Sequence, residues 1–543
     1  MGIEIERTES AVESALTIGD ILDAGVRTAP DQEIVYADKR RMTYRDLRER
    51  VHRLASALSD LGVQPGDTVA MMDWDTHRYL EAFFAIPMMG AVLHTINVRL
   101  SPEQMLYTIN HAEDKAILIN REFLEVVEGF SDRIETADTF VLLDDGEGPE
   151  DTGLEMAGEY EALLDKADPG FQFPELSEDT RATTFYTTGT TGLPKGVYFS
   201  HRQLVLHTLS GRNAMSGSGH GRFNQDDVYM PITPMFHVHA WGVPYMATMM
   251  GVKQVYPGRY EPQTLLQLLV GEKVTFSHCV PTIIQMLLQS EAAKNVDVSG
   301  WKVIIGGSAL AKPLCRQALE RGIDIYTGYG MSETCPLMTL SFMPPEAENA
   351  DLDTQVDYRT RTGRPVPLMQ LRVVDEDMND RPHDGESQGE VVARCPWLTQ
   401  GYLKDPENSE RLWQGGWLHT GDIGVIDPEG YLRITDRIKD VIKTGGEWVS
   451  SLELESMILR HEAVAECAVI GVPDDKWGER PMALVVKSGE VTEDAIKDML
   501  KDDADKGFIS KYGVPDQVRF VDSLPRTSVG KLDKKNMRNL YAE

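Results

Sequence analysis

The most informative segment of this chain is short and polar, and it reads YTTGTTGLPKG from Tyr186 to Gly196. It combines four threonines, three glycines and one lysine, so it offers backbone N–H groups, hydroxyl groups and a cation. These are the groups that bind polyphosphate in proteins. The common P-loop requires Ser or Thr after its lysine, whereas Gly196 follows Lys195 here. We therefore interpret the segment as a phosphate-binding loop of another kind, in preference to a polar turn without a ligand.

Short apolar runs on both sides of this loop predict buried strands. They cover residues 68–72, 116–119, 140–143, 274–280, 303–305 and 323–326. Apolar residues at helical spacing follow Thr43 and end near Gly62, and a second helix is expected at about residues 76–89. Strands that alternate with helices indicate an α/β fold with parallel sheets. At 543 residues the chain is long enough for one large, multi-lobed α/β domain and a further domain.

Two segments rich in charge divide the chain. Residues 144–173 are rich in Asp, Glu and Gly, and we expect a surface connection there, with a candidate seam between two α/β stretches. Residues 431–443 are dense in charge, and a stretch of about 100 residues with its own helix and strand patterns follows them. We predict a large N-terminal domain of residues 1–436 with layered α/β sheets, and a small α+β C-terminal domain of residues 437–543.

The charge balance limits the classes of partner. Asp and Glu number 86 against 54 Lys and Arg, which gives a formal net charge of -32. Such a charge works against a broad surface that binds nucleic acid or anionic lipid. We therefore expect small-molecule partners and no nucleic acid.

The cysteines and the amino terminus indicate the compartment. Five cysteines are scattered without the paired spacing of a zinc site or a disulfide framework. Residues 1–10 lack a basic start followed by an apolar stretch, and no apolar run approaches the roughly 20 residues that cross a bilayer. We expect a cytoplasmic protein with reduced thiols and no integral membrane segment, and a homodimer is left open.

The segment at residues 186–196 resembles the phosphate loop of the adenylate-forming enzymes, which include acyl-CoA synthetases, luciferases and the adenylation domains of peptide synthetases. The family usually has Ser where this chain has Thr188, and the change keeps the hydroxyl group. The resemblance covers nearly the whole chain in the family's order of motifs. It implies the adenylate-forming enzyme fold with a mobile C-terminal domain, and it implies ATP, Mg²⁺ and coenzyme A as cofactors or co-substrates.

Two further segments are similar to the family's nucleotide motifs. Residues 326–336, which read YTGYGMSETCP, are similar to the adenine and magnesium motif. The ring of Tyr329 can stack on a purine, Ser332 can reach a phosphate, and Glu333 supplies a hard oxygen ligand for Mg²⁺. Residues 306–310, which read GGSAL after an apolar strand, are similar to the segment that lies along the adenine and the acyl group.

The resemblance also assigns residues near the domain boundary. Asp422, in the segment 416–422, is assigned to the ribose hydroxyls, from which a carboxylate can accept two hydrogen bonds. Residues 436–440 look like the hinge between the large and small domains, with Arg437 near the ribose and Lys439 at the pivot.

Lys531 closes the run PRTSVGK and lies where the family has its adenylation lysine. Its ammonium would bridge the attacking carboxylate and the α-phosphate as pyrophosphate leaves. We assign catalysis to Lys531, Glu333 and His237, and Lys195 to the β- and γ-phosphates. The resemblance implies a nucleotide site made of Thr187, Thr188, Gly189, Thr190, Thr191, Lys195, Gly307, Ser308, Ala309, Gly328, Tyr329, Gly330, Met331, Ser332, Asp422 and Arg437.

Residues 235–242, which read MFHVHAWG, resemble the segment that shapes the acyl pocket. Peptide-synthetase adenylation domains place Asp after the Phe to hold an amine, whereas this chain has His237, so an amino acid substrate is not expected. Trp241 matches a position that gates the tunnel in fatty-acyl-CoA synthetases. No third ligand lies near His237 and His239 in sequence, which favours packing and gating over metal binding. The predicted acyl-binding residues are His237, Trp241, Gly306, Gly307 and Met331.

Residues 443–448, which read KTGGEW, resemble the loop that swings in for thioester formation and lines the pantetheine tunnel. Glycines there allow close passage of a slender thiol arm. This variant, together with PWLTQGY at residues 396–402, looks most like medium- and long-chain fatty-acyl and related CoA ligases. The residues predicted for CoA binding and the hinge are Lys439, Gly445, Gly446, Glu447 and Trp448.

These observations predict an AMP-forming acyl-CoA synthetase that works in two steps. A carboxylate attacks ATP to give acyl-AMP and pyrophosphate, and CoA then displaces AMP after the small domain rotates about Lys439. The expected acid is a medium- or long-chain fatty acid. Three alternatives stay open: a ligase for a short acid such as 3-methylthiopropionate, a relative that hands its adenylate to a carrier protein or to oxygen, and a non-catalytic nucleotide-binding regulatory protein.

Overall fold

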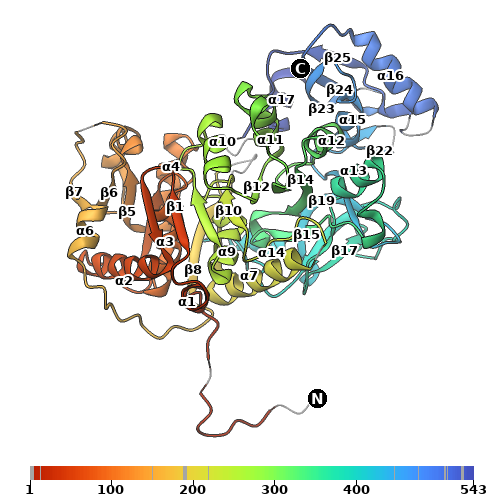
Figure 1. The fold of residues 1–543 in the computed structure, drawn as a ribbon. Coiled ribbons are helices and arrows are strands. Elements are labelled where there is room, and N and C mark those ends of the chain that lie inside the picture. Colours follow the sequence, from red (N-terminus) through yellow and green to blue (C-terminus); the bar gives the residue numbers. More distant parts are fainter. Residues whose placement is uncertain are drawn as a thin grey trace.

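The described residues form four β-sheets with helices packed against them, and the C-terminal sheet lies at one corner of the molecule (Figure 1). The computed structural model describes residues 5–12, 14–149, 151–187, 193–217, 219–444, 447–474, 476–506, 509, 511–527 and 531–542. None of the helices within these ranges has the length and apolar character that spanning a bilayer requires.

The first sheet has seven strands in the order β7-β6-β5-β3-β4-β8-β9. These are β3 (Thr68–Met72), β4 (Val92–Thr95), β5 (Asp114–Asn120), β6 (Thr139–Leu143), β7 (Met156–Glu159), β8 (Arg181–Tyr186) and β9 (Gly196–Ser200). All neighbouring pairs are parallel except β8 and β9, which form an antiparallel hairpin. The helices of this part are α2 (Tyr44–Asp60), α3 (His77–Met88), α4 (Pro102–Ala112), α5 (Leu124–Glu128) and α6 (Tyr160–Lys166).

The second sheet has nine strands in the order β16-β15-β14-β13-β12-β10-β11-β1-β2. These are β1 (Glu33–Tyr36), β2 (Arg40–Thr43), β10 (Val228–Pro231), β11 (Lys253–Tyr256), β12 (Phe276–Cys279), β13 (Lys302–Ile305), β14 (Asp324–Gly330), β15 (Leu337–Leu340) and β16 (Arg364–Pro365). The central strands β11, β10, β12, β13 and β14 run parallel. Its helices are α1 (Gly19–Thr28), α7 (His201–Ser216), α8 (Val238–Trp241), α9 (Val243–Met250), α10 (Pro262–Gly271), α11 (Pro281–Gln289), α12 (Lys312–Glu320) and α13 (Leu352–Thr360).

An antiparallel sheet and a mostly antiparallel sheet follow. The third sheet has the order β17-β18-β19-β20, with β17 (Gln370–Val374), β18 (Gly389–Arg394), β19 (Leu418–Ile426) and β20 (Leu432–Arg437), and α14 (Pro406–Leu412) precedes β19. The fourth sheet has the order β22-β21-β24-β23, and β25 pairs with β24 in parallel. It comprises β21 (Ile442–Thr444), β22 (Glu447–Val449), β23 (Val464–Asp474), β24 (Gly478–Lys487) and β25 (Gln517–Phe520), with helices α15 (Ser451–Ile458), α16 (Glu493–Asp505) and α17 (Lys534–Tyr541).

The predicted α/β fold is confirmed, and so are its local signals. Thr43 caps α2 with a reciprocal pair of hydrogen bonds, because its hydroxyl accepts from the Asp46 N–H while the Asp46 carboxylate accepts from the Thr43 N–H. The short apolar runs at residues 68–72 and 303–305 are β3 and part of β13, and their residues are buried. The helix expected at residues 76–89 is α3.

The interpretation of residues 144–173 as a surface connection at a seam is wrong. This segment contains β7 and α6, and β7 extends the seven-stranded sheet by pairing with β6. After the segment, β8 joins the same sheet beside β4, on the side away from β7. The first α/β unit therefore continues through it, up to β9.

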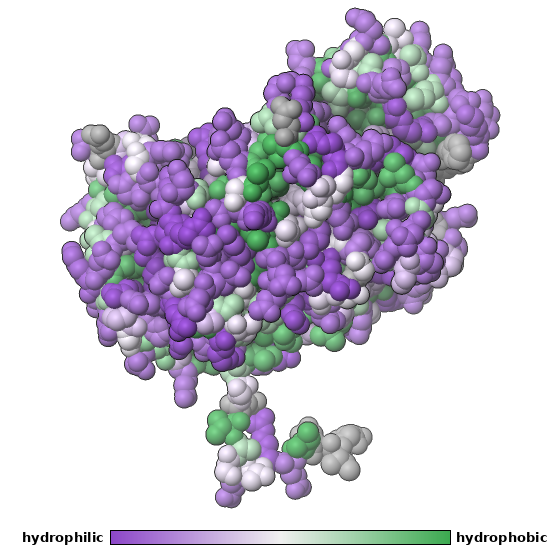
Figure 2. Space-filling model, in the orientation of Figure 1, coloured by the Kyte–Doolittle hydropathy of each residue, from purple (hydrophilic) through white to green (hydrophobic). Residues whose placement is uncertain are grey.

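The surface view agrees with the acidic, polar composition. Figure 2 shows a mainly hydrophilic face, interrupted by a strip of apolar residues in the middle of the view, where α10 and α11 lie. On α11, Ile283, Met286 and Leu288 are partly buried against the core beneath them. The five cysteines are free thiols.

Candidate active site

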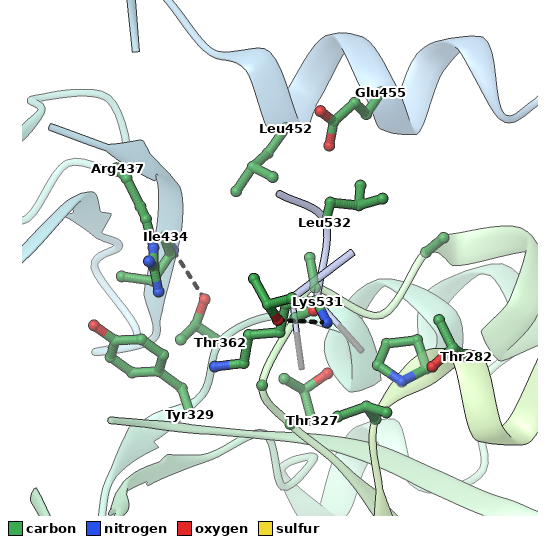
Figure 3. A pocket seen from close by; sticks show the side chains of 18 of the residues that line it. Thr282, Thr327, Tyr329, Thr362, Ile434, Arg437, Leu452, Glu455, Lys531 and Leu532 are labelled. Atoms are coloured by element: carbon green, nitrogen blue, oxygen red, sulfur yellow. Dashed lines mark hydrogen bonds between the residues drawn. The ribbon is translucent and has the colours of Figure 1, made fainter. Parts of the chain in front are cut away.

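A cavity of about 1090 Å³ gathers the motifs that the sequence separates by hundreds of residues. It lies between the nine-stranded sheet, the third sheet and the C-terminal part of the chain, and side chains from all three project into it (Figure 3). The predicted site residues that line it are Thr187, His237, Trp241, Gly306, Gly307, Ser308, Ala309, Gly328, Tyr329, Gly330, Met331, Ser332, Glu333, Asp422, Arg437, Lys439 and Lys531.

The ends of parallel strands explain why these motifs meet. The strands β8, β10 and β13 end directly before or a few residues before the segments at 187–195, 235–242 and 306–309, and β14 carries residues 328–330. In open α/β sheets the binding crevice lies at the carboxyl ends of the strands. The topology therefore brings the predicted phosphate, acyl and adenine motifs together at the carboxyl ends of strands from both large sheets.

Tyr329, Asp422 and Arg437 form one wall of the cavity. The Tyr329 hydroxyl donates to Asp422 Oδ2 at 2.6 Å, and Arg437 Nε lies 3.3 Å from Asp422 Oδ1. Asp422 on β19 faces Arg437 on β20 in the antiparallel ladder, so the sheet fixes the ion pair. Burial raises the pKa of Asp422, and Arg437 opposes this effect. This wall presents a carboxylate, a cation and an aromatic ring together.

Lys531 lies opposite this wall, close to Gly307. Its Nζ is 3.9 Å from the position that a Cβ would take at Gly307, and Gly307 has a positive φ of 77°. The backbone of Lys531 is tied to Thr527, whose hydroxyl accepts from the Lys531 N–H at 3.2 Å. Figure 3 shows the side chains of Lys531, Arg437 and Tyr329 turned toward the same space. Burial, together with the nearby Arg437, lowers the pKa of Lys531 to about 8.

Glu333 is buried beside the loop that begins after β8. Its Oε1 accepts from the Tyr402 hydroxyl at 2.7 Å, and Lys195 Nζ lies 4.5 Å above the centre of the Tyr402 ring. Burial raises the pKa of Glu333. Lys195 does not line the cavity, although its charge acts on Glu333. Tyr402 is thus a residue of the site that the sequence did not reveal, since only the tertiary fold brings it to Glu333.

The base of the phosphate loop closes the β8–β9 hairpin. The Thr187 N–H donates to the Lys195 carbonyl at 2.9 Å, and the Lys195 N–H donates to the Thr187 hydroxyl at 3.4 Å. The predicted contacts of Thr188, Gly189, Thr190 and Thr191 lie outside the described residues.

The acyl motif contains a run of left-handed backbone. The φ values are 49° at Val238, 55° at His239, 47° at Ala240, 59° at Trp241 and 72° at Gly242. A left-handed L-residue costs about 1–2 kcal/mol, so the four residues before the glycine store strain at the cavity. The turn places the side chains at 238 and 241 on the cavity wall.

Trp241 closes this side of the cavity. Its Cη2 atom lies 2.9 Å from the position that a Cβ would take at Gly306, and its ring lies 4.9 Å from the ring of His278, measured between centroids. His237 is neutral at physiological pH, because burial, with Lys531 as the next cause, lowers its pKa to about 3. His239 points away from this wall, into a group of aromatic rings.

The predicted hinge connects to the C-terminal sheet through short polar contacts. Asp436 Oδ2 accepts from the Ser451 N–H at 2.6 Å, the Ser450 hydroxyl donates to the Thr435 carbonyl, and Arg538 pairs with Asp440 at 2.6 Å. Lys439 lines the cavity. These contacts accompany an orientation in which Lys531 faces residues predicted to bind the nucleotide.

The predicted CoA loop is described only in part. Gly445 and Gly446 lie outside the described residues, and the backbones of Glu447 and Trp448 pair with Thr444 and Lys443 in the ladder of β21 and β22. Within the described ranges, no three His, Cys, Asp or Glu side chains gather as metal ligands do. The roles assigned to Glu333 and to the other site residues stay predictions.

Comparison with known proteins identifies the family. The sequence model of the AMP-binding enzymes matches residues 22–403, and that of the AMP-binding enzyme C-terminal domain matches residues 453–531. A long-chain-fatty-acid–CoA ligase of Thermus thermophilus is 40% identical over 541 residues, which cover 98% of this chain and 96% of that protein. A 3-methylmercaptopropionyl-CoA ligase of Ruegeria lacuscaerulensis is 38% identical, with 97% of this chain and 98% of that protein covered.

A solved structure of another protein has the same fold as this chain. The crystal structure of an anthranilate CoA ligase in complex with anthranoyl-AMP superposes with a TM-score of 0.85, covering 98% of each chain at 24% identity, which supports the fold alone. With the family models covering most of the chain and the motifs gathered around one cavity, the chain belongs to the AMP-binding enzymes, the adenylate-forming superfamily.

Proposed function

We propose that this protein is an ATP-dependent acid–CoA ligase that forms acyl-CoA, AMP and pyrophosphate through an acyl-AMP intermediate. One observation carries the proposal: Lys531, from the last motif, faces Tyr329, Asp422 and Arg437 in the cavity that also holds the acyl motif. Relatives of nearly the same length are CoA ligases.

In the first step the substrate carboxylate attacks the α-phosphorus of ATP. The new bond joins a carboxylate oxygen to phosphorus, and the bond to the pyrophosphate oxygen breaks. The ammonium of Lys531 stabilises the negative charge that builds up on both groups, in a buried site where such an interaction is stronger than in water. Asp422 accepts from the ribose hydroxyls, Tyr329 packs on the adenine, and Lys195 with the loop at 187–195 holds the β- and γ-phosphates.

Glu333 is the residue that would hold Mg²⁺. It is a buried carboxylate, and its pKa is raised by burial. A hard cation beside it would offset the cost of burying its charge, so the residue present fits a magnesium ion bound with the nucleotide. The ion would neutralise charge on the phosphates of ATP.

In the second step the thiolate of CoA attacks the acyl carbonyl, and the bond to the AMP oxygen breaks. We propose that residues 437–543 move as a small domain on the large domain of residues 1–436, with the hinge near 436–440. The fourth sheet and its own buried clusters support such a unit. Lys439, Gly445, Gly446, Glu447 and Trp448 would then guide CoA.

The acid is proposed to be a medium- or long-chain fatty acid. The wall made by Val238, Trp241, Val280 and Leu337 is apolar, as such a chain requires. A short acid such as 3-methylthiopropionate is the second candidate. The contact between the Trp241 ring and Gly306 favours it, because in this conformation the ring closes one side of the pocket.

A pyrophosphate-release assay with acids of graded chain length tests this proposal. Each acid is supplied with ATP and Mg²⁺, with and without CoA, and AMP and acyl-CoA are measured. We expect acid-dependent pyrophosphate release, and acyl-CoA only when CoA is present. Nucleotide binding without turnover over the whole panel would instead identify a regulatory protein.

A further inference from the structure

The left-handed turn at residues 238–242 needs neighbours that hold it in place. A run of left-handed L-residues persists only where the surrounding structure over-determines it. His239 adds to the cost, since it is buried and both of its ring nitrogens lack a hydrogen-bond partner among the described residues. The turn carries the two cavity side chains Val238 and Trp241, so whatever fixes it also fixes the acid pocket.

Side chains at the carboxyl ends of β3 and β4, in the seven-stranded sheet, fix the residues directly before the turn. Asp75 Oδ1 accepts from the Met235 N–H at 2.8 Å, and the Thr95 hydroxyl donates to the Phe236 carbonyl at 2.9 Å. Asp75 follows the carboxyl end of β3 and Thr95 is the last residue of β4. The turn itself follows β10 of the nine-stranded sheet. These two bonds therefore join the two sheets at the point where the acyl segment begins.

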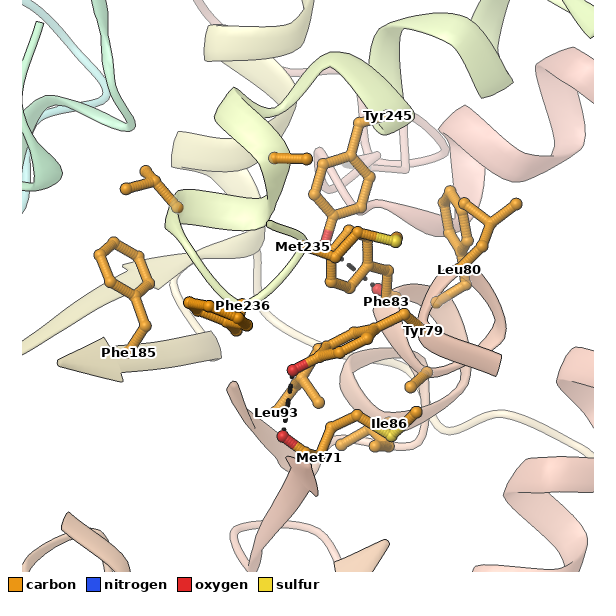
Figure 4. Close-up of a cluster of buried hydrophobic side chains, with 14 of the residues drawn as sticks. Met71, Tyr79, Leu80, Phe83, Ile86, Leu93, Phe185, Met235, Phe236 and Tyr245 are labelled. Atoms are coloured by element: carbon orange, nitrogen blue, oxygen red, sulfur yellow. Dashed lines mark hydrogen bonds between the residues drawn. The ribbon is translucent and has the colours of Figure 1, made fainter. Parts of the chain in front are cut away.

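The carboxylate of Asp75 has a second donor. The Tyr260 hydroxyl donates to Asp75 Oδ2, and the Gly258 N–H donates to the Asp75 carbonyl at 2.9 Å. Asp75 is 3% exposed, so its bonds form away from water. It thus ties three segments that are distant in sequence, and only one of them reaches the cavity. Figure 4 shows Met235 and Phe236 enclosed by buried side chains that include Tyr79, Phe83 and Phe185.

We propose that Asp75 is a positioning residue for acid binding, which acts through the Met235 N–H to set where His237 and Trp241 stand in the pocket. This inference rests on the proposed function, because it names a determinant of the acid site. Thr95 assists by holding the next carbonyl group. Neither side chain lines the cavity, and Met235 and Phe236 connect the Asp75 hydrogen bond to His237, which does.

Three variants separate positioning from plain stability. Asp75→Ala removes the acceptor of the Met235 N–H, whereas Asp75→Asn keeps one acceptor oxygen there and can donate to the Tyr260 oxygen. Thr95→Val removes only the bond to Phe236 and keeps the side-chain shape. Asp114→Asn is the matched control, since Asp114 is a fully buried carboxylate at the amino end of β5 in the same sheet, hydrogen-bonded to His94.

The first measurement is the steady-state rate of pyrophosphate release. Leaving the buried Met235 N–H without its acceptor corresponds to a loss of about 10- to 100-fold, and we expect the KM for the acid to rise by this factor in Asp75→Ala. The KM for ATP should stay within about threefold, since Asp422 and Tyr329 are untouched. Asp75→Asn should recover most of the acid affinity, Thr95→Val should lose less than Asp75→Ala, and Asp114→Asn should keep both KM values.

The second measurement needs no activity. Hydrogen exchange of full-length protein, followed by mass spectrometry of peptides that cover residues 235–242, should be faster in Asp75→Ala and close to wild type in Asp75→Asn. If the wild-type protein shows no acid-dependent pyrophosphate release, the proposed function fails while exchange still tests the positioning role. Unchanged exchange at 235–242, or equal increases in both KM values, would overturn the inference. If the Asp75→Ala protein is insoluble, the same two measurements are made on Thr95→Val.

Discussion

Replacing Lys534 by Met removes the ammonium from a buried ion pair in the C-terminal part of the chain. Lys534 Nζ lies 2.6 Å from Glu455 Oε1, and their side chains are 8% and 9% exposed. The ammonium also donates to the Ser451 hydroxyl at 2.6 Å. Lys534 begins α17, three residues after Lys531, so this pair anchors to α15 the segment that carries the proposed adenylation lysine.

The expected loss of stability follows from the charge that is left behind. Without Lys534, the Glu455 carboxylate keeps one donor, the Val469 N–H at 2.8 Å, in a place where burial already raises its pKa. Removing one partner of a buried ion pair destabilises a protein by about 3–5 kcal/mol. In the double variant Lys534→Met/Glu455→Gln the remaining group is neutral and still accepts from Val469, so most of the loss should be recovered.

Native-state hydrogen exchange measures this free energy within the full-length protein. The amides of β23 report the opening of the C-terminal sheet, and their opening free energy should fall by about 3–5 kcal/mol in Lys534→Met. Lys501→Met, which removes the exposed partner of Asp498 in the same part of the chain, should leave it unchanged. Equal effects of Lys534→Met and of the double variant would refute the reasoning, because the unpaired buried carboxylate would then not be the cause.

Three further predictions concern the cavity. Since burial lowers the pKa of Lys531 to about 8, its ammonium loses the proton as the pH rises through 8, and kcat/KM for ATP should fall on that alkaline side. Lys531→Arg, which keeps its charge, should remove this alkaline decline in a pH profile, and an identical decline would contradict the assignment. Asp422→Asn should raise the KM for ATP by about 10- to 100-fold while the KM for the acid changes little, and equal changes would argue against a ribose contact. Trp241→Ala should shift the preference in the acid panel toward longer chains, because its ring closes the pocket against Gly306. An unchanged preference would mean that other residues limit the chain length.

Much of the fold follows from local sequence signals. Apolar runs predict the central strands because parallel strands are buried on both faces, and the helical spacing after Thr43 predicts α2 correctly. β7 escaped prediction for a physical reason. Its sequence, MAGE, contains no β-branched or aromatic residue, and it becomes a strand at the edge of the sheet only because β6 offers a partner.

The site residues divide in the same way. Some are predicted from local sequence, and others are brought to the site only by the tertiary fold. Residues inside motifs, such as Tyr329 and Lys531, were predicted, and the structure brings them to one cavity. Tyr402 and Asp75 were not predicted as site residues. Each acts through a hydrogen bond to a residue far away in the chain, Glu333 in one case and Met235 in the other, and no spacing in the sequence reports such a contact.

The most direct test of the central claim separates the two half-reactions in Lys531→Ala. One assay measures pyrophosphate release from acid and ATP, and the other measures acyl-CoA formation from supplied acyl-AMP and CoA. Loss of one charge-stabilising group costs about 10²–10³ in rate, so pyrophosphate release should fall by at least this factor, whereas thioester formation should stay close to wild type. Normal pyrophosphate release by Lys531→Ala would contradict the account.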